Sequence, residues 1–475
     1  MTFSRLWVFL AVALPVLAAL IANLSSVDLT YHLRAGDEML RSGSLPTVDT
    51  WTYTVAGQPW TDQQWAAQIL LELVFRAGGW TGLVLLRATL VGIIFGCLLL
   101  VGLRRGLGER RAAWLALAAF AVSAVALALR PQLMGMALFA IVLVLVTDRR
   151  AHPGRLWLVP LIVAVWANLH GSFFLGPLVL GLAWIEDRVD RIPGADRTLA
   201  VAIVSAVAAC LTPSGPFIWS YAIGLSTNPE VTARITEWQP TSLRDVPGIA
   251  FFASALAVVA LIARRGRPTP WPTLLWLAVF FLIGAYAVRG VAWWPLATVA
   301  AIAGILVTGP AGERLPAEGT RLMRRLNVVV AGAIVVIGVA LLPLWRPLEP
   351  GLETPAGVVG NAPPGITGAL REIAQPGDRL FAPQPWGSWF EWALPELPVA
   401  IDSRIELFPP ETWDAYTKVV AGVDGWQDQL EAWDVTVVVA AGESEDAFAE
   451  RLLAAGWRRL YADADGTVLA APEQT

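Results

Sequence analysis

Long apolar runs without a single charged residue constrain this chain more than any other feature. Residues 6–24, 112–129 and 327–342 contain no Asp, Glu, Lys or Arg. About 18 or more such residues in a helix cross the ~30 Å hydrocarbon core of a bilayer. Hydrophobic residues make up 56% of the chain and charged residues only 15%, whereas soluble domains carry roughly a quarter charged residues. The sequence therefore predicts a polytopic α-helical membrane protein.

Apolar runs continue along most of the first 345 residues. Each is long enough to form a helix, and we expect about eleven membrane spans in total. The first run has the composition of a long signal peptide, but its length and the lack of a small-residue cleavage pattern favour an uncleaved span. The expected spans are residues 6–24, 80–103, 112–129, 133–147, 156–169, 172–185, 198–212, 248–263, 271–287, 291–308 and 327–344.

The balance of charge changes along the chain and predicts its domains. Residues 1–345 hold 26 basic and 17 acidic side chains, and residues 346–475 hold 8 and 21. We expect a transmembrane domain over 1–345 with a first external loop at 25–79, a Pro- and Gly-rich linker over 346–375, and a small α/β domain over 376–475. In that domain RLFAP, PVAID, VTVVVA and YADADGTVLAA are typical of strands, and 385–394, 410–421, 425–433 and 444–455 of helices.

Arginines between the runs predict the topology. Alternate loops that begin with the N-terminus hold 18 arginines, and the other set holds 7. The positive-inside rule then places the N-terminus in the cytoplasm and the C-terminal domain outside it, in a plasma (inner) membrane. Joining 156–185 into one span would reverse everything downstream and would leave RRGR at 264–267 outside, so we expect two short spans there.

Several functional classes lack their signatures. The sequence has no Walker A motif, GxGxxG, GxSxG, HExxH or Cys/His zinc spacing, so it predicts no metal site and identifies no cofactor. Its two cysteines lie in apolar runs and predict no disulfide framework. Basic residues sit in short loops rather than on one face, which argues against binding of nucleic acid.

Ionisable residues gather on the predicted outer side. Asp28 and His32 are four residues apart on an expected amphipathic helix, in which Leu29, Leu33 and Leu40 recur at helical spacing. Ionisable groups at membrane depth are costly and usually face a polar cavity or a partner. The other members of this expected outer site are Arg87, Arg130, His170, Glu237 and Arg289.

Each of these residues also has an ordinary structural interpretation. Asp28 suits a helix N-cap, and Arg130 before Pro131 suits a cap on helix carbonyls. His32 can be an interface residue, His170 can satisfy the backbone at a turn, and Glu237 can be solvated in its loop. In the tail, Asp402 and Arg404 are either a binding pair at the carboxyl edge of the sheet or an ion pair that fixes a turn.

Four short segments resemble those of a known superfamily. They are DLTYHLRAG at 28–36, GQPWTDQQWAAQ at 57–68, WANLHGSF at 166–173 and PWGSWFEW with VAIDSR between 385 and 404. With the expected layout of one span, an external loop opening on Asp, many further spans and an external tail, the chain resembles the GT-C superfamily of polytopic membrane glycosyltransferases. Within it, the chain is most similar to bacterial relatives of protein O-mannosyltransferases and aminoarabinose transferases.

The resemblance implies transfer of a sugar from a polyprenyl-phosphate carrier to an extracytoplasmic acceptor. It implies a lipid-linked donor and membrane lipids as partners, with Asp28 as general base, Arg130 and Arg289 as phosphate ligands, and His32, His170 and Glu237 in support. The residues leave two alternatives: a non-enzymatic protein of envelope assembly or of lipid or polymer transport with an outward cavity, or a lipid-linked polymer ligase. Sugar, carrier and acceptor are not specified by the sequence.

Overall fold

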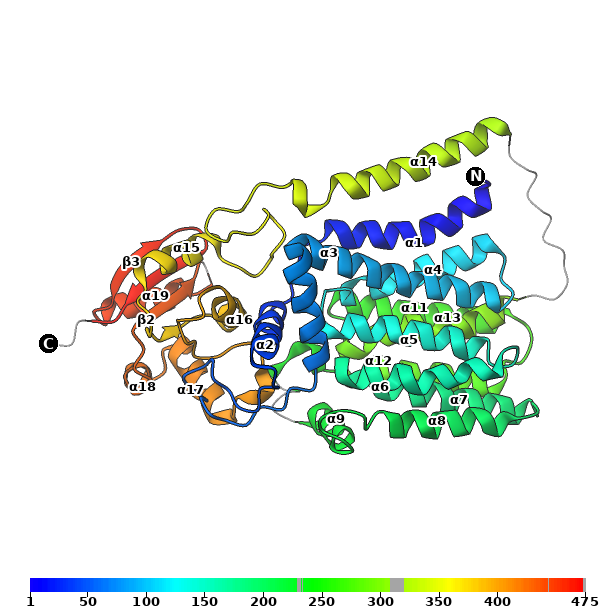
Figure 1. Cartoon of the computed structure of the whole chain (residues 1–475), viewed down its shortest axis with the longest axis horizontal. Coiled ribbons are helices and arrows are strands. Elements are labelled where there is room, and N and C mark those ends of the chain that lie inside the picture. The colour runs from blue at the N-terminus through cyan, green and yellow to red at the C-terminus, as the bar shows by residue number, and fades with distance from the viewer. Residues whose placement is uncertain (229–231, 233, 308–319, 443, 473–475) are drawn as a thin grey trace. The chain divides into compact units, whose positions relative to one another are not determined.

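The computed structural model describes residues 1–228, 232, 234–307, 320–442 and 444–472 of the chain. These residues form two compact units, which are described separately (Figure 1). One, the helical unit, contains residues 1–22 and 84–342. The other, the mixed unit, contains residues 23–83 and 343–475.

Every apolar run expected from the sequence coincides with a helix. Five helices among the described residues are long and apolar enough to cross a membrane, namely Phe3–Ile21, Trp65–Arg104, Val246–Arg264, Val288–Leu306 and Arg321–Ala340. The number of spans remains a prediction. The helices that lie in or enter the helical unit are α1 (Phe3–Ile21), α3 (Trp65–Arg104), α4 (Glu109–Ser123), α5 (Pro131–Thr147), α6 (Val159–Leu169), α7 (Leu175–Val189), α8 (Ala195–Ala208), α9 (Phe217–Thr227), α11 (Val246–Arg264), α12 (Trp271–Tyr286), α13 (Trp293–Leu306) and α14 (Arg321–Ala340).

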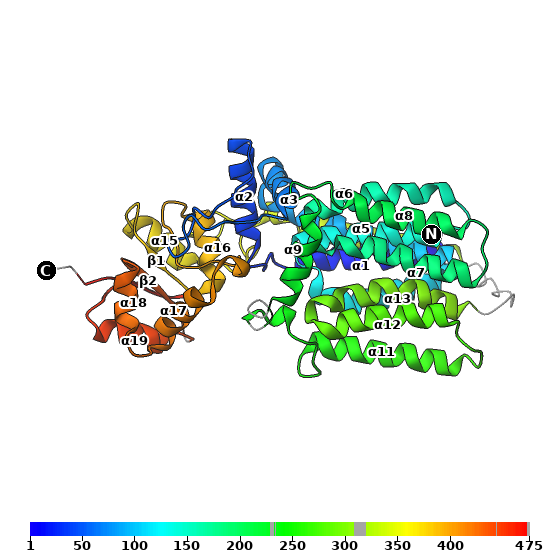
Figure 2. The same ribbon diagram turned by 90° about the horizontal axis from the view of Figure 1, so that it is seen from below.

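Polar and proline residues set the ends of several of these helices. The side chains of Thr2, Asp245 and Thr320 accept hydrogen bonds from the first turns of α1, α11 and α14, as good N-caps do. Pro131 begins α5, where its missing N–H has no partner to lose. Figure 2 shows α11, α12 and α13 next to one another, and α12 and α13 pack together.

The interruption expected near His170 separates two helices. Helix α6 ends at Leu169, a 3₁₀ turn spans Gly171–Phe174, and α7 begins at Leu175. This turn packs against α5, because a Cβ added at Gly135 would lie 2.7 Å from Trp166 Nε1 and 2.9 Å from Ser172 Oγ. Only glycine permits that approach, so the turn is held close to the N-terminal end of α5.

The mixed unit contains a four-stranded sheet with the order β1-β2-β4-β3. The pairing of β1 with β2 is parallel, and β4 is antiparallel to both β2 and β3. The elements are α2 (Leu29–Ser42), the first part of α3, α15 (Pro364–Ile373), β1 (Leu380–Phe381), α16 (Gln384–Ala393), η7 (Ile405–Leu407), α17 (Pro410–Ala421), α18 (Trp426–Ala432), β2 (Val437–Ala441), α19 (Asp446–Ala454), β3 (Arg458–Ala462) and β4 (Gly466–Ala470).

The expected tail elements are present with two differences. PVAID is not a strand, because its Val399 makes only isolated bridges, to Leu380 and to Thr52. YADADGTVLAA is not one strand but parts of a hairpin, since the chain turns between β3 and β4, where the N–H groups of Asp465 and Gly466 donate to Asp463 Oδ1. The region expected to be a linker contains α15, whose Ile366 and Leu370 are buried.

The first loop shares its hydrophobic core with the tail. Trp51 and Trp60 are buried in one cluster with Phe381, Ile401 and Phe448. The sequence-based division assigned residues 25–79 to the transmembrane domain, whereas the structure groups them with residues 343–475. Burial of large aromatic side chains accounts for this grouping, since each ring removes much apolar surface from water. The expected amphipathic helix is α2, whose Leu29 and Leu33 are buried.

Candidate functional site

Three of the predicted residues meet at one end of the helical unit. Arg130 immediately precedes α5, and its Nη1 lies 2.5 Å from Oε1 of Glu237 in the 3₁₀ turn Thr236–Trp238. Arg289, in the turn Val288–Ala292, places its guanidinium 5.2 Å from the ring centroid of Trp238. The three segments, far apart in sequence, therefore form one polar cluster, which we call the Arg130–Arg289 cluster.

Backbone contacts hold this cluster together. The side-chain amide of Gln132 donates to the carbonyl of Arg289 over 3.4 Å, and the Val288 N–H donates to the carbonyl of Gln239 over 3.0 Å. Thr241 adds a hydroxyl hydrogen bond of 2.5 Å to the carbonyl of Gly284. The turn that carries Arg289 is thus fixed to the loop that carries Glu237.

The two arginines of the cluster differ in how far their charge is compensated. Arg130 is paired with Glu237, and both side chains remain partly exposed. The Nε of Arg289 is enclosed and has no hydrogen-bond partner among the described residues, and Arg289 makes no ion pair with any of them. A guanidinium has five N–H donors in a fixed fork that suits a phosphate. Arg289 therefore has capacity for an added anion.

His170 is buried and contacts the backbone of its own turn. The N–H of Ser172 donates to His170 Nδ1 over 3.1 Å, and the Ser172 hydroxyl lies 2.7 Å from the same nitrogen. Ser172 Oγ also accepts from the Trp166 indole N–H over 3.1 Å. Because Nδ1 is an acceptor, the proton of the neutral ring lies on Nε2. The structure thus shows His170 in the turn-capping role.

Arg87 has a structural contact within the helical unit. Its Nη2 donates to the carbonyl of Ala22, the residue that follows α1. A cation at the C-terminal end of a helix is favoured by the exposed carbonyl groups and by the helix dipole. Arg87 is buried, and this contact accounts for its position inside α3.

Asp28 and His32 belong to the mixed unit, at the start of α2. Asp28 occupies the N-cap position, but its side chain makes no capping hydrogen bond to the helix. His32 is buried, with its ring centroid 4.0 Å from that of Tyr31. Burial raises the pKa of Tyr31, and the negative charge of Asp28 adds to the shift. The Asp28 carboxylate is therefore not used as a helix cap.

Two acidic residues near Tyr31 were not singled out from the sequence. Asp62 and Glu406 both contribute electrostatically to the raised pKa of Tyr31. Asp62 Oδ1 accepts from the Gln64 N–H over 3.1 Å and from the Gln68 amide over 3.0 Å. Burial raises the pKa of Asp62 to about 7, with a further contribution from Glu406. Asp62 lies inside the GQPWTDQQWAAQ segment quoted above, which was the available signal.

Asp402 and Arg404 form the centre of a buried ionic cluster. Arg404 Nε donates to Asp402 Oδ2 over 2.8 Å, and its Nη2 donates to Asp49 Oδ1 over 2.6 Å. Its guanidinium carbon lies 4.2 and 4.6 Å from the ring centroids of Trp51 and Trp60. All three charged side chains have no solvent exposure. This geometry favours the interpretation of Asp402 and Arg404 as a structural ion pair. Asp49 was not identified from the sequence as a third member.

A further carboxyl group completes this cluster, which we call the Arg404 cluster. Glu391 Oε1 lies 3.8 Å from Arg404 Nη2, and its side chain is fully buried. Burial raises the pKa of Glu391, and the nearby Asp402 carboxylate raises it further. Both effects favour the protonated form of Glu391. Among the described residues, no three His, Cys, Asp or Glu side chains are grouped so as to hold a metal ion.

Known proteins give a fold but no sequence family. No protein-family model matches the sequence, and no curated protein matches it. Among solved structures, the chain is similar to the Archaeoglobus fulgidus oligosaccharyltransferase tethered to an acceptor peptide with an NVT sequon. The TM-score is 0.54 at 12% identity, over 98% of this chain and 74% of that one. The apo form of the same protein gives 0.49 at 11% identity, over 91% and 69%.

This similarity identifies the fold. Oligosaccharyltransferases are GT-C fold glycosyltransferases, so the chain has a membrane GT-C fold, in agreement with its apolar helices. The predicted superfamily agrees with this fold. The more specific likeness to protein O-mannosyltransferases and aminoarabinose transferases remains a prediction.

Proposed function

We propose that the protein is a membrane glycosyltransferase that moves a sugar from a polyprenyl-phosphate carrier to an acceptor outside the cytoplasm. The observation that carries this proposal is the GT-C fold shared over 98% of the chain with an oligosaccharyltransferase. The Arg130–Arg289 cluster supports it, because Arg289 makes no ion pair with any described residue and has a guanidinium of the kind that binds phosphate. A non-enzymatic transport protein has no equivalent requirement for a general base such as Asp28.

The proposed reaction is a displacement at the anomeric carbon of the donor sugar. The acceptor hydroxyl oxygen attacks that carbon, and the bond from the carbon to the carrier phosphate oxygen breaks. The proton of the hydroxyl passes to the Asp28 carboxylate, and the electron pair of the broken bond stays on the phosphate. The added negative charge is stabilised by arginine, through charge-assisted hydrogen bonds.

The contacts of each residue refine its proposed role. Arg289 is the main phosphate ligand, and Arg130 contributes less because Glu237 already neutralises it. His170 supports the site from its turn, and His32 orients the start of α2 beside Tyr31. Arg87, Asp402 and Arg404 support the structure rather than touch the substrate, because their partners are within the protein.

The test is turnover of the purified full chain with a panel of polyprenyl-phosphate sugars, measured as release of polyprenyl phosphate. Asp28→Asn should lower kcat by a factor of ~10² to 10⁴, the usual contribution of a general base. The melting temperature should stay nearly unchanged, because the Asp28 side chain makes no capping hydrogen bond to α2 that the substitution would remove. Asp37→Asn is the matched control, since Asp37 lies on the same helix and pairs with Arg41 and Arg76 at the surface.

Two results would overturn the proposal. Full activity of Asp28→Asn would exclude Asp28 as the base. Absence of turnover with every donor, together with retained binding of the lipid carrier, would favour a non-enzymatic envelope or transport function.

A further inference from the structure

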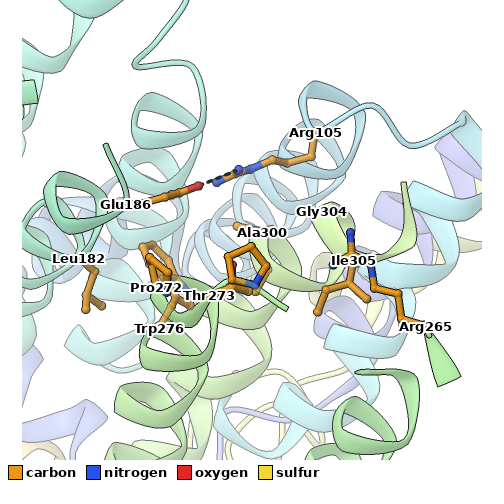
Figure 3. A pocket seen from close by; sticks show the side chains of 12 residues that line it. Arg105, Leu182, Glu186, Arg265, Pro272, Thr273, Trp276, Ala300, Gly304 and Ile305 are labelled. Atoms are coloured by element: carbon orange, nitrogen blue, oxygen red, sulfur yellow. Dashed lines mark ion pairs between the residues drawn. The ribbon is translucent and has the colours of Figure 1, made fainter. Parts of the chain in front are cut away.

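A cavity of about 160 Å³ lies in the helical unit, between the ends of five helices (Figure 3). Its walls include Arg105 after α3, Glu186 in α7, Arg265 after α11, and residues of α12 and α13. Arg105 is next to Arg104, which pairs with Asp148 at the C-terminal end of α5. Arg130 precedes the N-terminal end of the same helix. The 17 residues of α5 span roughly 25 Å at ~1.5 Å per residue, so the cavity and the Arg130–Arg289 cluster lie about that far apart.

Among the described residues, the ionic groups around this cavity leave one guanidinium uncompensated. Three arginines and three carboxylates form a connected network through ion pairs of 2.7–3.8 Å, and Arg104 pairs separately with Asp148 over 3.0 Å. Arg265 makes no ion pair with any described residue. The members of the network are Arg105, Arg149, Arg150, Glu186, Asp187 and Asp190.

Two further features of the wall favour a negative ligand. The N-terminal end of the 16-residue helix α12 lines the cavity with Pro270, Pro272 and Thr273, and helix N-termini attract anions. The Nε of Arg105 is enclosed without a hydrogen-bond partner among the described residues. Figure 3 shows Arg105 directed toward Glu186, and that contact is long, at 3.8 Å.

The negative charge of Glu186 does not cancel the positive charge of the cavity wall. Its Oε2 lies 2.9 Å from Arg149 Nη2, and its Oε1 lies 3.6 Å from Arg150 Nη2. The carboxylate is therefore already neutralised from the side of α5, and the positive charge of Arg265 remains. A ligand with one negative charge would balance the cavity.

We propose that this cavity binds the phosphodiester of one anionic phospholipid. A phosphodiester carries one negative charge and can accept hydrogen bonds from the guanidinium groups of Arg265 and Arg105, which both line the cavity. The lipid form is favoured over free phosphate because α12 exposes a run of large apolar side chains beside the cavity. Trp271, Leu274 and Leu282 are 55%, 44% and 64% exposed, and acyl chains cover such faces in a membrane.

The test is a titration of the detergent-solubilised full chain with dioleoylphosphatidylglycerol, followed by native mass spectrometry. One bound lipid should be retained. Arg265→Gln should weaken its apparent affinity about tenfold or more, the effect of losing a hydrogen bond between charged partners. Arg267→Gln is the matched control, since Arg267 is exposed in the same loop and outside the cavity wall. The affinity of this variant for the lipid should stay within about twofold of the wild-type value.

The outcomes separate the possibilities clearly. Equal affinities of the Arg265→Gln and Arg267→Gln variants, or no retained lipid, would overturn the proposal. Displacement of the lipid by millimolar inorganic phosphate would overturn the lipid assignment, because the acyl chains would then contribute nothing. Dioleoylphosphatidylcholine should bind more weakly than the anionic lipid. None of these measurements depends on glycosyl transfer.

Discussion

The Arg404 cluster and the Arg130–Arg289 cluster both bring arginine together with acidic and aromatic residues, yet they differ in completeness. Arg404 is fully buried, paired with Asp49 and Asp402, and stacked near two tryptophans. Arg289 is partly exposed, lies near one tryptophan, and has no ion pair among the described residues. A buried arginine whose charge is already compensated has no reason to bind a ligand, whereas an uncompensated one at a surface has.

This difference gives a criterion that separates structural from ligand-binding charged residues in such a chain. A buried charge needs compensation within the fold, because removal from water costs several kcal/mol. A half-exposed charge keeps part of its hydration and can exchange it for a ligand. Compensation, rather than charge alone, therefore separates structural arginines from candidate binding arginines.

Removal of the Arg404 charge should have the largest effect on stability. Arg404→Met leaves Asp49 and Asp402 buried without their cation, which costs about 3–5 kcal/mol when one partner of a buried pair is lost. Unfolding of the full chain, followed by tryptophan fluorescence, should show the loss, since Trp51 and Trp60 lie against the guanidinium. Arg459→Met, at an exposed site on β3, should change little. Equal stability of the two variants would show that the buried Arg404 charge is no more important for folding than an exposed one.

Arg289→Gln should have an intermediate effect, on substrate binding. We expect KM for the lipid-linked donor to rise about tenfold with kcat nearly unchanged, because a charge-assisted contact to the phosphate is lost. Arg130→Gln should raise KM less, since Glu237 shares its charge. Arg244→Gln, exposed in the same loop region, is the control. Direct binding of polyprenyl phosphate should follow the same order, and a larger effect at Arg130 than at Arg289 would reverse the assignment.

Asp62→Asn should have the smallest effect, and it depends on pH. Burial raises the folded-state pKa of Asp62 from 3.8 to about 7, so its ionisation opposes folding. The loss of folding stability is absent below pH ~4, grows as the pH rises from ~4 to ~7, and is fully present above pH ~7. Asn keeps the acceptor for the Gln64 N–H. Its melting temperature at pH 8 should exceed that of the wild type by roughly 2–4 °C, the shift for 1 kcal/mol, and match it near pH 4. A lower melting temperature of the variant than of the wild type at both pH values would contradict this prediction.

Local patterns predicted the elements well. Apolar runs and their interruptions located most helices of the helical unit, including the break at His170, because membrane helices depend on local composition. Helix α9 was missed, since it lies between the expected spans 198–212 and 248–263. The meeting of Arg130, Glu237 and Arg289 was also expected, since alternate loops of an up-and-down bundle lie at the same end.

Contacts between distant segments could not be predicted. The Asp49–Arg404 pair joins residues 355 positions apart, and no local pattern marks Asp49 as a partner. PVAID has the composition of a strand, but its Val399 makes only isolated bridges, to Thr52 and Leu380 earlier in the sequence. Asp62 was overlooked because its enclosure, which shifts its pKa, arises only from tertiary packing.

The core shared by the first loop and the tail has a consequence for synthesis. Trp51 and Trp60 are synthesised early, but the residues that bury them, such as Phe381 and Ile401, are made much later. At ~5–20 residues per second, the interval of 355 residues between Asp49 and Arg404 lasts roughly 20–70 seconds. During that time the loop exposes aromatic surface and an unpaired Asp49. The nascent loop is thus a natural client for a chaperone, and a chain truncated before the tail would retain that exposed surface permanently.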